Sequence, residues 1–234
     1  MSDEDGIHDF EYGGVAREAV DWLASRGYLR EGDCAMNVAC GRGGFAGPMS
    51  RLVRVLVCMD KNPAALAEAG RRCAGGCRTE LYQADWNTYE PSEGYDACLI
   101  SPSYLCYSGE ALVKMEAASR RSCIAVFPQV FDFRRLRKAL LRSAGVPAEM
   151  QEFSDPRPFT IWLKDAGRQF ESVEFAGTVT CPREVLRDAF VSVCVGRVPD
   201  QALLPLAERF ADSISHDGTA SYRFAAHVVA WDKG

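Results

Sequence analysis

Hydrophobic positions in the first 145 residues follow two alternating patterns. Helical spacing, with apolar residues three, four or seven positions apart, begins at Val15 and continues to about Tyr28. Further helices are predicted at Phe45–Val53, Pro63–Cys73 and Phe133–Ser143. Short apolar runs between the helices predict five strands: Cys34–Ala39, Arg54–Met59, Thr79–Gln83, Tyr95–Ile100 and Ser122–Phe127. Every run except the third is nearly continuous, which is typical of strands buried on both faces. The alternation predicts an open, mostly parallel α/β sheet with right-handed crossovers.

The pattern is less regular after Pro147. Phe159–Leu163 fits either a strand or a helix, and the Ala166-Gly167 that follows is typical of a helix end. The remaining segments predict strands at Phe170–Val179 and Tyr222–Trp231, with helices at Glu184–Val193 and Leu203–Ala211 between them. Two helices inserted between the last two strands would form a cap over one edge of the sheet.

Composition and charge limit the classes of protein to which the chain can belong. The 234 residues are 47% hydrophobic and 25% charged, as in soluble globular domains, and are enough to bury a core without metal or disulfides. With 27 basic and 32 acidic residues, the net charge of −5 argues against binding nucleic acid through its phosphates. The basic residues of the Phe133–Ser143 helix are better explained as its solvent face. They are Arg134, Arg135, Arg137, Lys138 and Arg142.

The N-terminus and the cysteines bear on the compartment. The first 30 residues are acidic and lack the pattern of a signal peptide, and no apolar run is long enough to span a membrane. We therefore expect a cytoplasmic protein with no membrane partner, whose ten cysteines are reduced. Most lie in apolar runs, as Cys58 and Cys98 do, and Cys73-x3-Cys77 has no second pair or nearby histidine to complete a zinc site. No metal site is predicted.

Four predicted strands end in residues suited to a nucleoside. The carboxyl ends of parallel strands meet at one edge of the sheet, where ligands bind. After the first strand, Gly41 and Gly43 allow a close approach of the backbone to a ligand. After the second, Asp60 lies 19 positions beyond Gly41, a spacing at which a carboxylate can accept hydrogen bonds from ribose hydroxyls.

The third strand is followed by Asp85-Trp86, an acceptor and an aromatic plane suited to adenine, and the fourth by the hydroxyl-rich turn Ser101-Pro102-Ser103-Tyr104. Each feature alone also fits a turn, a helix cap or a packing residue. Their occurrence in order at four strand ends favours a nucleoside-containing ligand.

Gly41-x-Gly43-x-x-Ala46 also satisfies the dinucleotide fingerprint, so an NAD(P)-dependent oxidoreductase is an alternative. However, a helix precedes the first strand, and the glycines lie in Asn-Val-Ala-Cys-Gly-Arg-Gly, residues 37–43. With Asp60 and Asp85-Trp86, this string resembles the class I S-adenosylmethionine (SAM)-dependent methyltransferases over residues 15–130.

The resemblance implies a Rossmann-like sheet of seven strands, with the last strand antiparallel and next to the strand before it. It implies one domain over residues 1–234, made of an N-terminal helical segment (1–30), a cofactor-binding half (31–145) and a substrate-side half (146–234) with a helical cap at about 180–217. The resemblance also implies SAM as the cofactor and a set of cofactor-binding residues. Residues 39–43 would bind the methionine moiety, Asp60 the ribose, and Asp85 with Trp86 the adenine. Lys61, next to Asp60, is also among the cofactor-binding residues. The turn from Ser101 to Tyr104 would lie near the methyl group, with Ser101 and Pro102 among the cofactor-binding residues, and Tyr12 would fold over the methionine end. The predicted cofactor-binding residues of the loop are Ala39, Cys40, Gly41 and Gly43.

Two residues depart from the family pattern. Asn37 stands where an acidic residue is usual, which removes a charge that helps to orient the cofactor's ammonium group. Ala39 stands in place of the first glycine and adds a methyl group where the backbone approaches the ligand.

The turn after the fourth strand bears on the acceptor. Ser101-Pro102-Ser103-Tyr104 shares only its proline and tyrosine with the Asn/Asp-Pro-Pro-Tyr/Phe turn of enzymes that methylate amino groups of nucleic acids. We therefore predict a small-molecule acceptor and no nucleic-acid partner. A nucleic-acid or protein methyltransferase and a non-catalytic SAM-binding protein are alternatives. Because positioning can supply most of the catalysis of methyl transfer, no catalytic residue need be visible. Tyr104 and His216 are the candidates, although His216 also fits an exposed turn.

Overall fold

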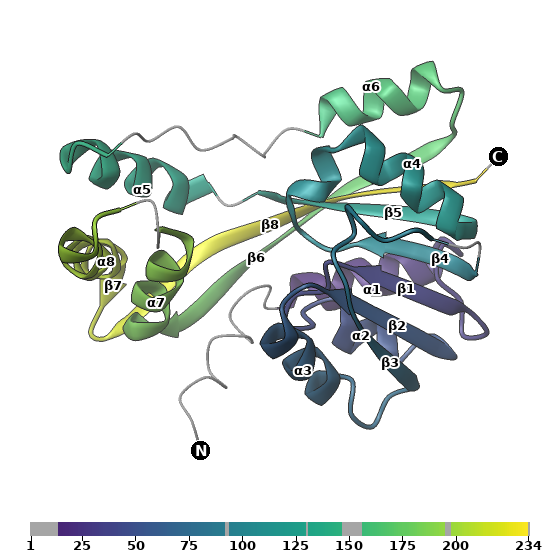
Figure 1. Ribbon diagram of the computed structural model, residues 1–234, viewed down its shortest axis with the longest axis horizontal. Coiled ribbons are helices and arrows are strands. Elements are labelled where there is room, and N and C mark those ends of the chain that lie inside the picture. The colour runs from purple at the N-terminus through teal and green to yellow at the C-terminus, as the bar shows by residue number, and fades with distance from the viewer. Residues whose placement is uncertain (1–13, 92–93, 130, 147–155, 195–197, 234) are drawn as a thin grey trace. The chain divides into compact units, whose positions relative to one another are not determined.

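An eight-stranded sheet with helices around it forms the protein, seen here in a computed structural model (Figure 1). The structure describes residues 14–91, 94–129, 131–146, 156–194 and 198–233. The strands are β1 (Cys34–Val38), β2 (Val55–Asp60), β3 (Arg78–Gln83), β4 (Tyr95–Ile100), β5 (Ser119–Gln129), β6 (Phe170–Pro182), β7 (Ser215–His216) and β8 (Thr219–Asp232). The helices are α1 (Val15–Ser25), α2 (Ala46–Ser50), α3 (Pro63–Arg72), the 3-10 helix η2 (Tyr104–Tyr107), α4 (Gly109–Ala118), α5 (Phe131–Ser143), α6 (Arg157–Asp165), α7 (Arg183–Cys194) and α8 (Asp200–Ile214).

The strand order confirms the predicted fold class. It is β3-β2-β1-β4-β5-β8-β6, with the short β7 paired to β8. Strands β1 to β5 pair in parallel, whereas β8 is antiparallel to β5 and lies next to β6. The order reverses between β1 and β4, because the chain first builds toward β3 and then returns to the other side of β1. This switch point is where open α/β sheets bind ligands.

The chain divides into two compact units. The larger one contains residues 14–129, 153–175 and 225–234, and the smaller contains residues 1–13, 130–152 and 176–224. Strands β6 and β8 contribute residues to both units. Every described residue from β1 to α4 belongs to the larger unit, so the predicted cofactor site can be described within that unit alone.

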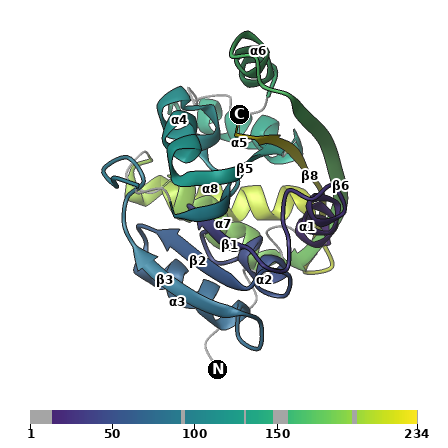
Figure 2. The same cartoon turned by 90° about the vertical axis from the view of Figure 1, so that its right-hand side faces the viewer.

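Both faces of the sheet in the larger unit are covered. Helices α2 and α3 contact β2 on one face, and α1 packs against α2 (Figure 2). Met36, Val38 and Ile100 belong to a buried core cluster that also contains Met115 of α4 and Leu163 of α6. Coverage on both faces explains why the β1, β2 and β4 sequences are nearly continuous apolar runs. The edge strand β3 is mostly exposed, and it is the one strand that the hydrophobic pattern singled out as different.

The segment that fitted either a strand or a helix is the helix α6. Phe159 and Leu163 are buried, whereas Ile161 between them is 56% exposed. A strand would place all three side chains on one face, whereas helical geometry separates the middle one from the other two. The helix ends at Asp165 with Ala166 as its C-cap, and Gly167 follows with a left-handed φ of 70°, so the predicted helix end at Ala166-Gly167 is confirmed.

The predicted Phe45–Val53 helix needs correction, and three further elements had no predicted bounds. Helix α2 has only five residues instead of nine, because Gly47 and Pro48 lie inside it and the chain continues as turns to Val53. The sequence pattern gave no bounds for η2 and α4, and β7 was not predicted. Helix α4 begins with a cap that the sequence does contain, since the Ser108 hydroxyl accepts a hydrogen bond from the Ala111 amide at 3.2 Å.

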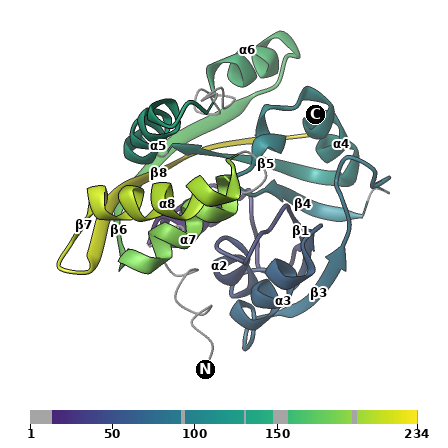
Figure 3. The same cartoon turned by 60° about the vertical axis from the view of Figure 1, so that its left-hand side comes forward.

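The smaller unit contains α5, α7, α8 and the hairpin of β7 with β8 (Figure 3). Helices α7 and α8 pack through Phe190 and Phe210, whose ring centroids are 4.9 Å apart. Arg183 donates from Nε to Asp212 at 2.7 Å and also pairs with Glu208. These two helices are the ones predicted between the last two long strands.

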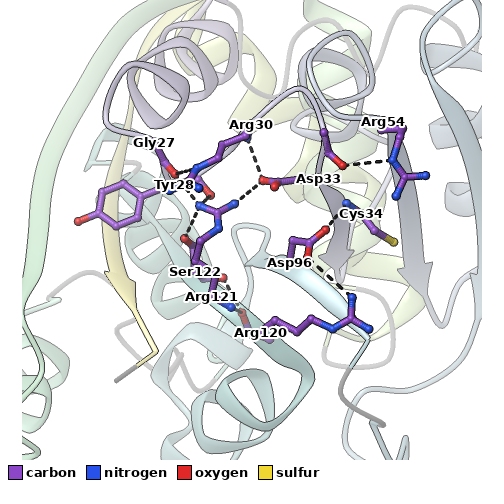
Figure 4. Close-up of polar contacts among 12 residues, drawn as sticks. Gly27, Tyr28, Arg30, Asp33, Cys34, Arg54, Asp96, Arg120, Arg121 and Ser122 are labelled. Atoms are coloured by element: carbon purple, nitrogen blue, oxygen red, sulfur yellow. Dashed lines mark hydrogen bonds and ion pairs between the residues drawn. The ribbon is translucent and has the colours of Figure 1, made fainter.

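An ion pair between the half-buried Arg121 and the buried Asp33 joins the amino ends of the strands, at the edge opposite the predicted site (Figure 4). Arg121 Nη2 donates to Asp33 Oδ2 at 2.6 Å, and its Nη1 donates to the Gly27 carbonyl at 2.6 Å and to Ser122 Oγ at 3.0 Å. Asp33 also accepts the Arg30 amide at 2.9 Å. One guanidinium thus connects the end of α1, the start of β1 and the start of β5.

We predict that Arg121→Ala lowers the free energy of unfolding by about 2 kcal/mol, because it leaves the Asp33 carboxylate buried without its cation. Arg120→Ala is the matched control, since Arg120 is 55% exposed and lies 3.8 Å from Asp96. Such an exposed pair contributes less than about 0.5 kcal/mol. Urea unfolding of the three proteins measures both effects, and equal losses in the two variants would contradict the assignment.

Candidate functional site

The loop after β1 contains three residues with left-handed backbone. The φ angles are 50° at Ala39, 53° at Gly41 and 92° at Gly43. Left-handed φ costs a residue with a Cβ roughly 1–2 kcal/mol, which explains why a glycine is usual at position 39 and what the alanine costs there. The Gly43 amide donates to the Cys40 carbonyl at 3.0 Å and closes the turn.

Gly41 and Gly43 serve different purposes. A Cβ on Gly41 would meet nothing within 4 Å, so the space beside this residue is open to a ligand. A Cβ on Gly43 would lie 2.7 Å from the Ala69 Cα atom of helix α3. Gly43 is therefore required for the packing of the loop against α3, and Gly41 is the glycine that leaves room at the site.

Asp60 holds this loop from the end of β2. Its Oδ2 accepts the Gly41 amide at 2.8 Å, and its Oδ1 accepts the Asn62 amide at 2.9 Å. The Asn62 side chain in turn caps α3 by accepting the Ala64 amide at 3.0 Å. A carboxylate has about four acceptor positions, so two bonded backbone amides leave capacity for a ligand. Lys61, next to Asp60, is exposed.

A polar pair spans the switch point. Ser101, directly after β4, donates from Oγ to Asn37 Oδ1 at 2.7 Å, and its amide donates to the Val38 carbonyl at 2.9 Å. Both side chains are buried, with Asn37 fully so. The structure thus brings residues 37 and 101 together, as the strand-end argument expects of groups at one edge of a parallel sheet.

Asp85 and Trp86 follow β3, but the Trp86 ring is not exposed as the predicted adenine-binding plane would be. The Trp86 ring is 3% exposed, donates from Nε1 to the Ala111 carbonyl at 3.2 Å and stacks on Tyr89. Lys114 Nζ lies 5.9 Å from its centroid. The indole therefore packs against helix α4. The half-buried Asp85 uses Oδ1 to accept the Asn87 amide at 2.9 Å, and no residue that the structure describes bonds to its Oδ2, which can serve a ligand.

The remaining predicted residues have distinct positions. Pro102 is half-buried after Ser101, and the backbone of Tyr104 begins η2, although its side chain lies outside the described part of the structure. Tyr12 also lies outside the described residues. His216 is in the exposed turn between β7 and β8, with a side chain 95% exposed and 3.4 Å from Asp217. It belongs to the smaller unit.

The ten cysteines are all free. Burial raises the pKa of Cys106 and of Cys123 to about 12, so these thiols stay protonated at neutral pH and serve as packing groups. A hydrogen bond from Cys58 lowers the pKa of Cys73 below its usual value. Within the described ranges, no three His, Cys, Asp or Glu side chains group in a way that could hold a metal.

Sequence reasoning missed two contributors, Asn62 and Lys114, and named Ser103 only as part of the turn after the fourth strand. Asn62 orders the loop through its amide and caps α3, and an asparagine directly before Pro63 was the available signal. The Ser103 Oγ is buried and has no hydrogen-bond partner among the residues that the structure describes. Lys114 donates to the Trp86 carbonyl at 2.9 Å, a contact with no signal because its helix was not predicted.

Comparison with known proteins identifies the fold. The sequence matches no family model and no curated protein. A SAM-dependent methyltransferase from Thiobacillus denitrificans, in complex with S-adenosyl-L-homocysteine (SAH), aligns with a TM-score of 0.56 at 12% identity over 99% of this chain and 98% of that one. Magnesium protoporphyrin IX methyltransferase from Synechocystis PCC 6803, with bound SAH, gives 0.51 at 15% identity over 91% and 80%.

Coclaurine N-methyltransferase, bound to N-methylheliamine and SAH, gives a TM-score of 0.52 at 12% identity over 92% of this chain and 71% of that one. This chain therefore has the Rossmann-like fold of the class I methyltransferases. In the described part of the chain, no helix is both long and apolar enough to cross a membrane.

Proposed function

We propose that this protein is a SAM-dependent methyltransferase that acts on a small-molecule acceptor. The observation that carries the proposal is the Asp60 carboxylate, which ties the Gly41 amide to the end of β2 beside the switch point while keeping acceptor capacity free. The fold, and the presence of SAH in solved structures that share it, support the same cofactor.

The residues present fit this cofactor. The open space at Gly41 admits a ligand against the backbone, and Asp60, with Lys61 beside it, would bind the ribose hydroxyls. Asp85 would accept from the adenine amine, while the buried Trp86 would contribute through its place in the loop rather than through an exposed ring face. Ala39, Cys40 and Gly43 shape the loop, and Ser101 and Pro102 would border the methyl group.

The cofactor, when bound, supplies a methyl group already activated by the sulfonium, so the protein's main task is to align the acceptor with it. No residue of this chain then needs to form a covalent intermediate. Tyr104 and His216 remain candidates for removing a proton from the acceptor. Helices α7 and α8, within residues 180–217, would contribute the substrate cap.

The competing cofactor is less well supported. A dinucleotide-binding loop places its pyrophosphate at the N-terminus of a helix, where the helix dipole favours negative charge. Here the helix after the glycines, α2, has only five residues. A nucleic-acid acceptor is also disfavoured, because Ser101 lacks the amide or carboxylate acceptor that would hold a planar amine. Two proteins with this fold are named for small molecules, magnesium protoporphyrin IX and coclaurine.

Transfer of a labelled methyl group tests the proposal. The protein is incubated with methyl-labelled SAM and a cell extract, which is then separated into metabolites, RNA and protein. We expect label in the metabolite fraction, lost with Asp60→Ala and retained with Glu80→Ala, a carboxylate of the edge strand β3. Label in RNA or protein would contradict a small-molecule acceptor and point to a nucleic-acid or protein acceptor. SAH binding without any transfer would indicate a non-catalytic binding protein.

A further inference from the structure

Two buried donors at the switch point have no acceptor among the residues that the structure describes. Asn37 is fully buried, and no acceptor in the described part of the chain reaches its Nδ2. The Ser103 hydroxyl, after β4, is likewise buried and without a partner among the described residues. Buried polar groups are normally hydrogen-bonded, so unpaired donors at a ligand-binding edge indicate that the ligand brings the acceptor.

The orientation of the Asn37 amide follows from its neighbour. Ser101 is 2% exposed, and its hydroxyl proton is accepted by Asn37 Oδ1 at 2.7 Å. Turning the amide by 180° would direct Nδ2 at Ser101 and deprive the serine proton of this acceptor. The observed orientation satisfies the serine and leaves the two N–H groups of Asn37 as the unpaired ones.

An amino acid carries an ammonium group and a carboxylate, and the side chain at position 37 decides which of the two is bound there. A carboxylate at position 37 would attract an ammonium group, whereas an amide N–H and a serine hydroxyl donate to carboxylate oxygens. We propose that Asn37, held by Ser101, is a specificity-determining residue that makes this site bind the amino-acid end of the cofactor through its carboxylate and not through its ammonium. This inference rests on the proposed function.

Analogues of SAH that lack one group at a time test it. Isothermal titration compares SAH with its des-amino analogue, its decarboxylated analogue and 5′-methylthioadenosine, which lacks the amino-acid end. For the natural protein, we expect removal of the ammonium to weaken binding less than about 3-fold and removal of the carboxylate to weaken it about 30-fold. Asn37→Asp, nearly isosteric and still able to accept the Ser101 proton, should reverse that order.

Gln83→Glu is the matched control, because it makes the same change from amide to acid on the exposed end of β3, paired with Asp60 in the sheet register. It should keep the order of the natural protein. A natural protein that depends more on the ammonium, or an Asn37→Asp variant with an unchanged order, would overturn the inference. Failure of every analogue to bind, 5′-methylthioadenosine included, would instead refute the proposed function.

Discussion

Replacing Asp60 with alanine should weaken SAH binding by more than about 100-fold, because the variant loses the ribose acceptor and the tie to the cofactor loop together. In the natural protein the carboxylate accepts the amides of Gly41 and Asn62 at 2.8 and 2.9 Å. Without it, Gly41 is no longer fixed against β2, and the entropic cost of ordering the loop is subtracted from the binding free energy. Isothermal titration with SAH measures the loss.

Two further variants make the Asp60 result specific. Asp60→Asn keeps one acceptor oxygen and should fall between the natural protein and Asp60→Ala. Glu80→Ala removes a carboxylate from β3 that pairs with Arg78 at 2.8 Å, and it should bind SAH normally. If Asp60→Ala bound SAH as tightly as Glu80→Ala does, the ligand would lie elsewhere.

Gly43→Ala should be among the most destabilising single substitutions in the cofactor loop. The new Cβ would lie 2.7 Å from the Ala69 Cα atom and would hold a left-handed φ of 92°. Overpacking and backbone strain together should lower the free energy of unfolding by about 3 kcal/mol, which in a chain of this size lowers Tm by roughly 6–12 °C.

Gly41→Ala is the comparison for Gly43→Ala. Its φ of 53° is also left-handed, but a Cβ there would have no neighbour within 4 Å. We expect a loss of only about 1 kcal/mol in stability, with a larger loss in SAH affinity because the methyl group occupies the ligand's space. Calorimetric Tm values and titrations separate the two effects. Equal Tm losses would show that α3 does not approach Gly43 so closely.

Much of the fold followed from the sequence, because the strands of the parallel sheet are buried on both faces. Such strands are short apolar runs between helices, and Tyr95–Ile100 was predicted to the residue. The ambiguous Phe159–Leu163 could not be assigned, because burial of its first and last residues with exposure of Ile161 is decided by packing against the core cluster. Helix α4 received no predicted bounds, although most of its residues (Glu, Ala, Leu, Lys and Met) are strong helix formers.

The part of the site formed by residues at strand ends could be predicted from the sequence. Residues at the ends of adjacent parallel strands must meet, and Asn37 and Ser101 do. Two features depended on tertiary contacts. The Trp86 ring turns inward because Ala111 and Lys114 of α4 provide partners for it, and Gly43 is small because α3 passes beside it. Both partners lie more than 20 positions along the chain, beyond the reach of a local pattern.

The most direct measurement of the central claim is a titration of the natural protein with SAH and, separately, with NAD and NADP. We predict that SAH binds at one site per chain and that neither dinucleotide binds. Binding of NAD or NADP without binding of SAH would contradict the account, because the loop from Ala39 to Gly43 and the Asp60 carboxylate would then serve a dinucleotide.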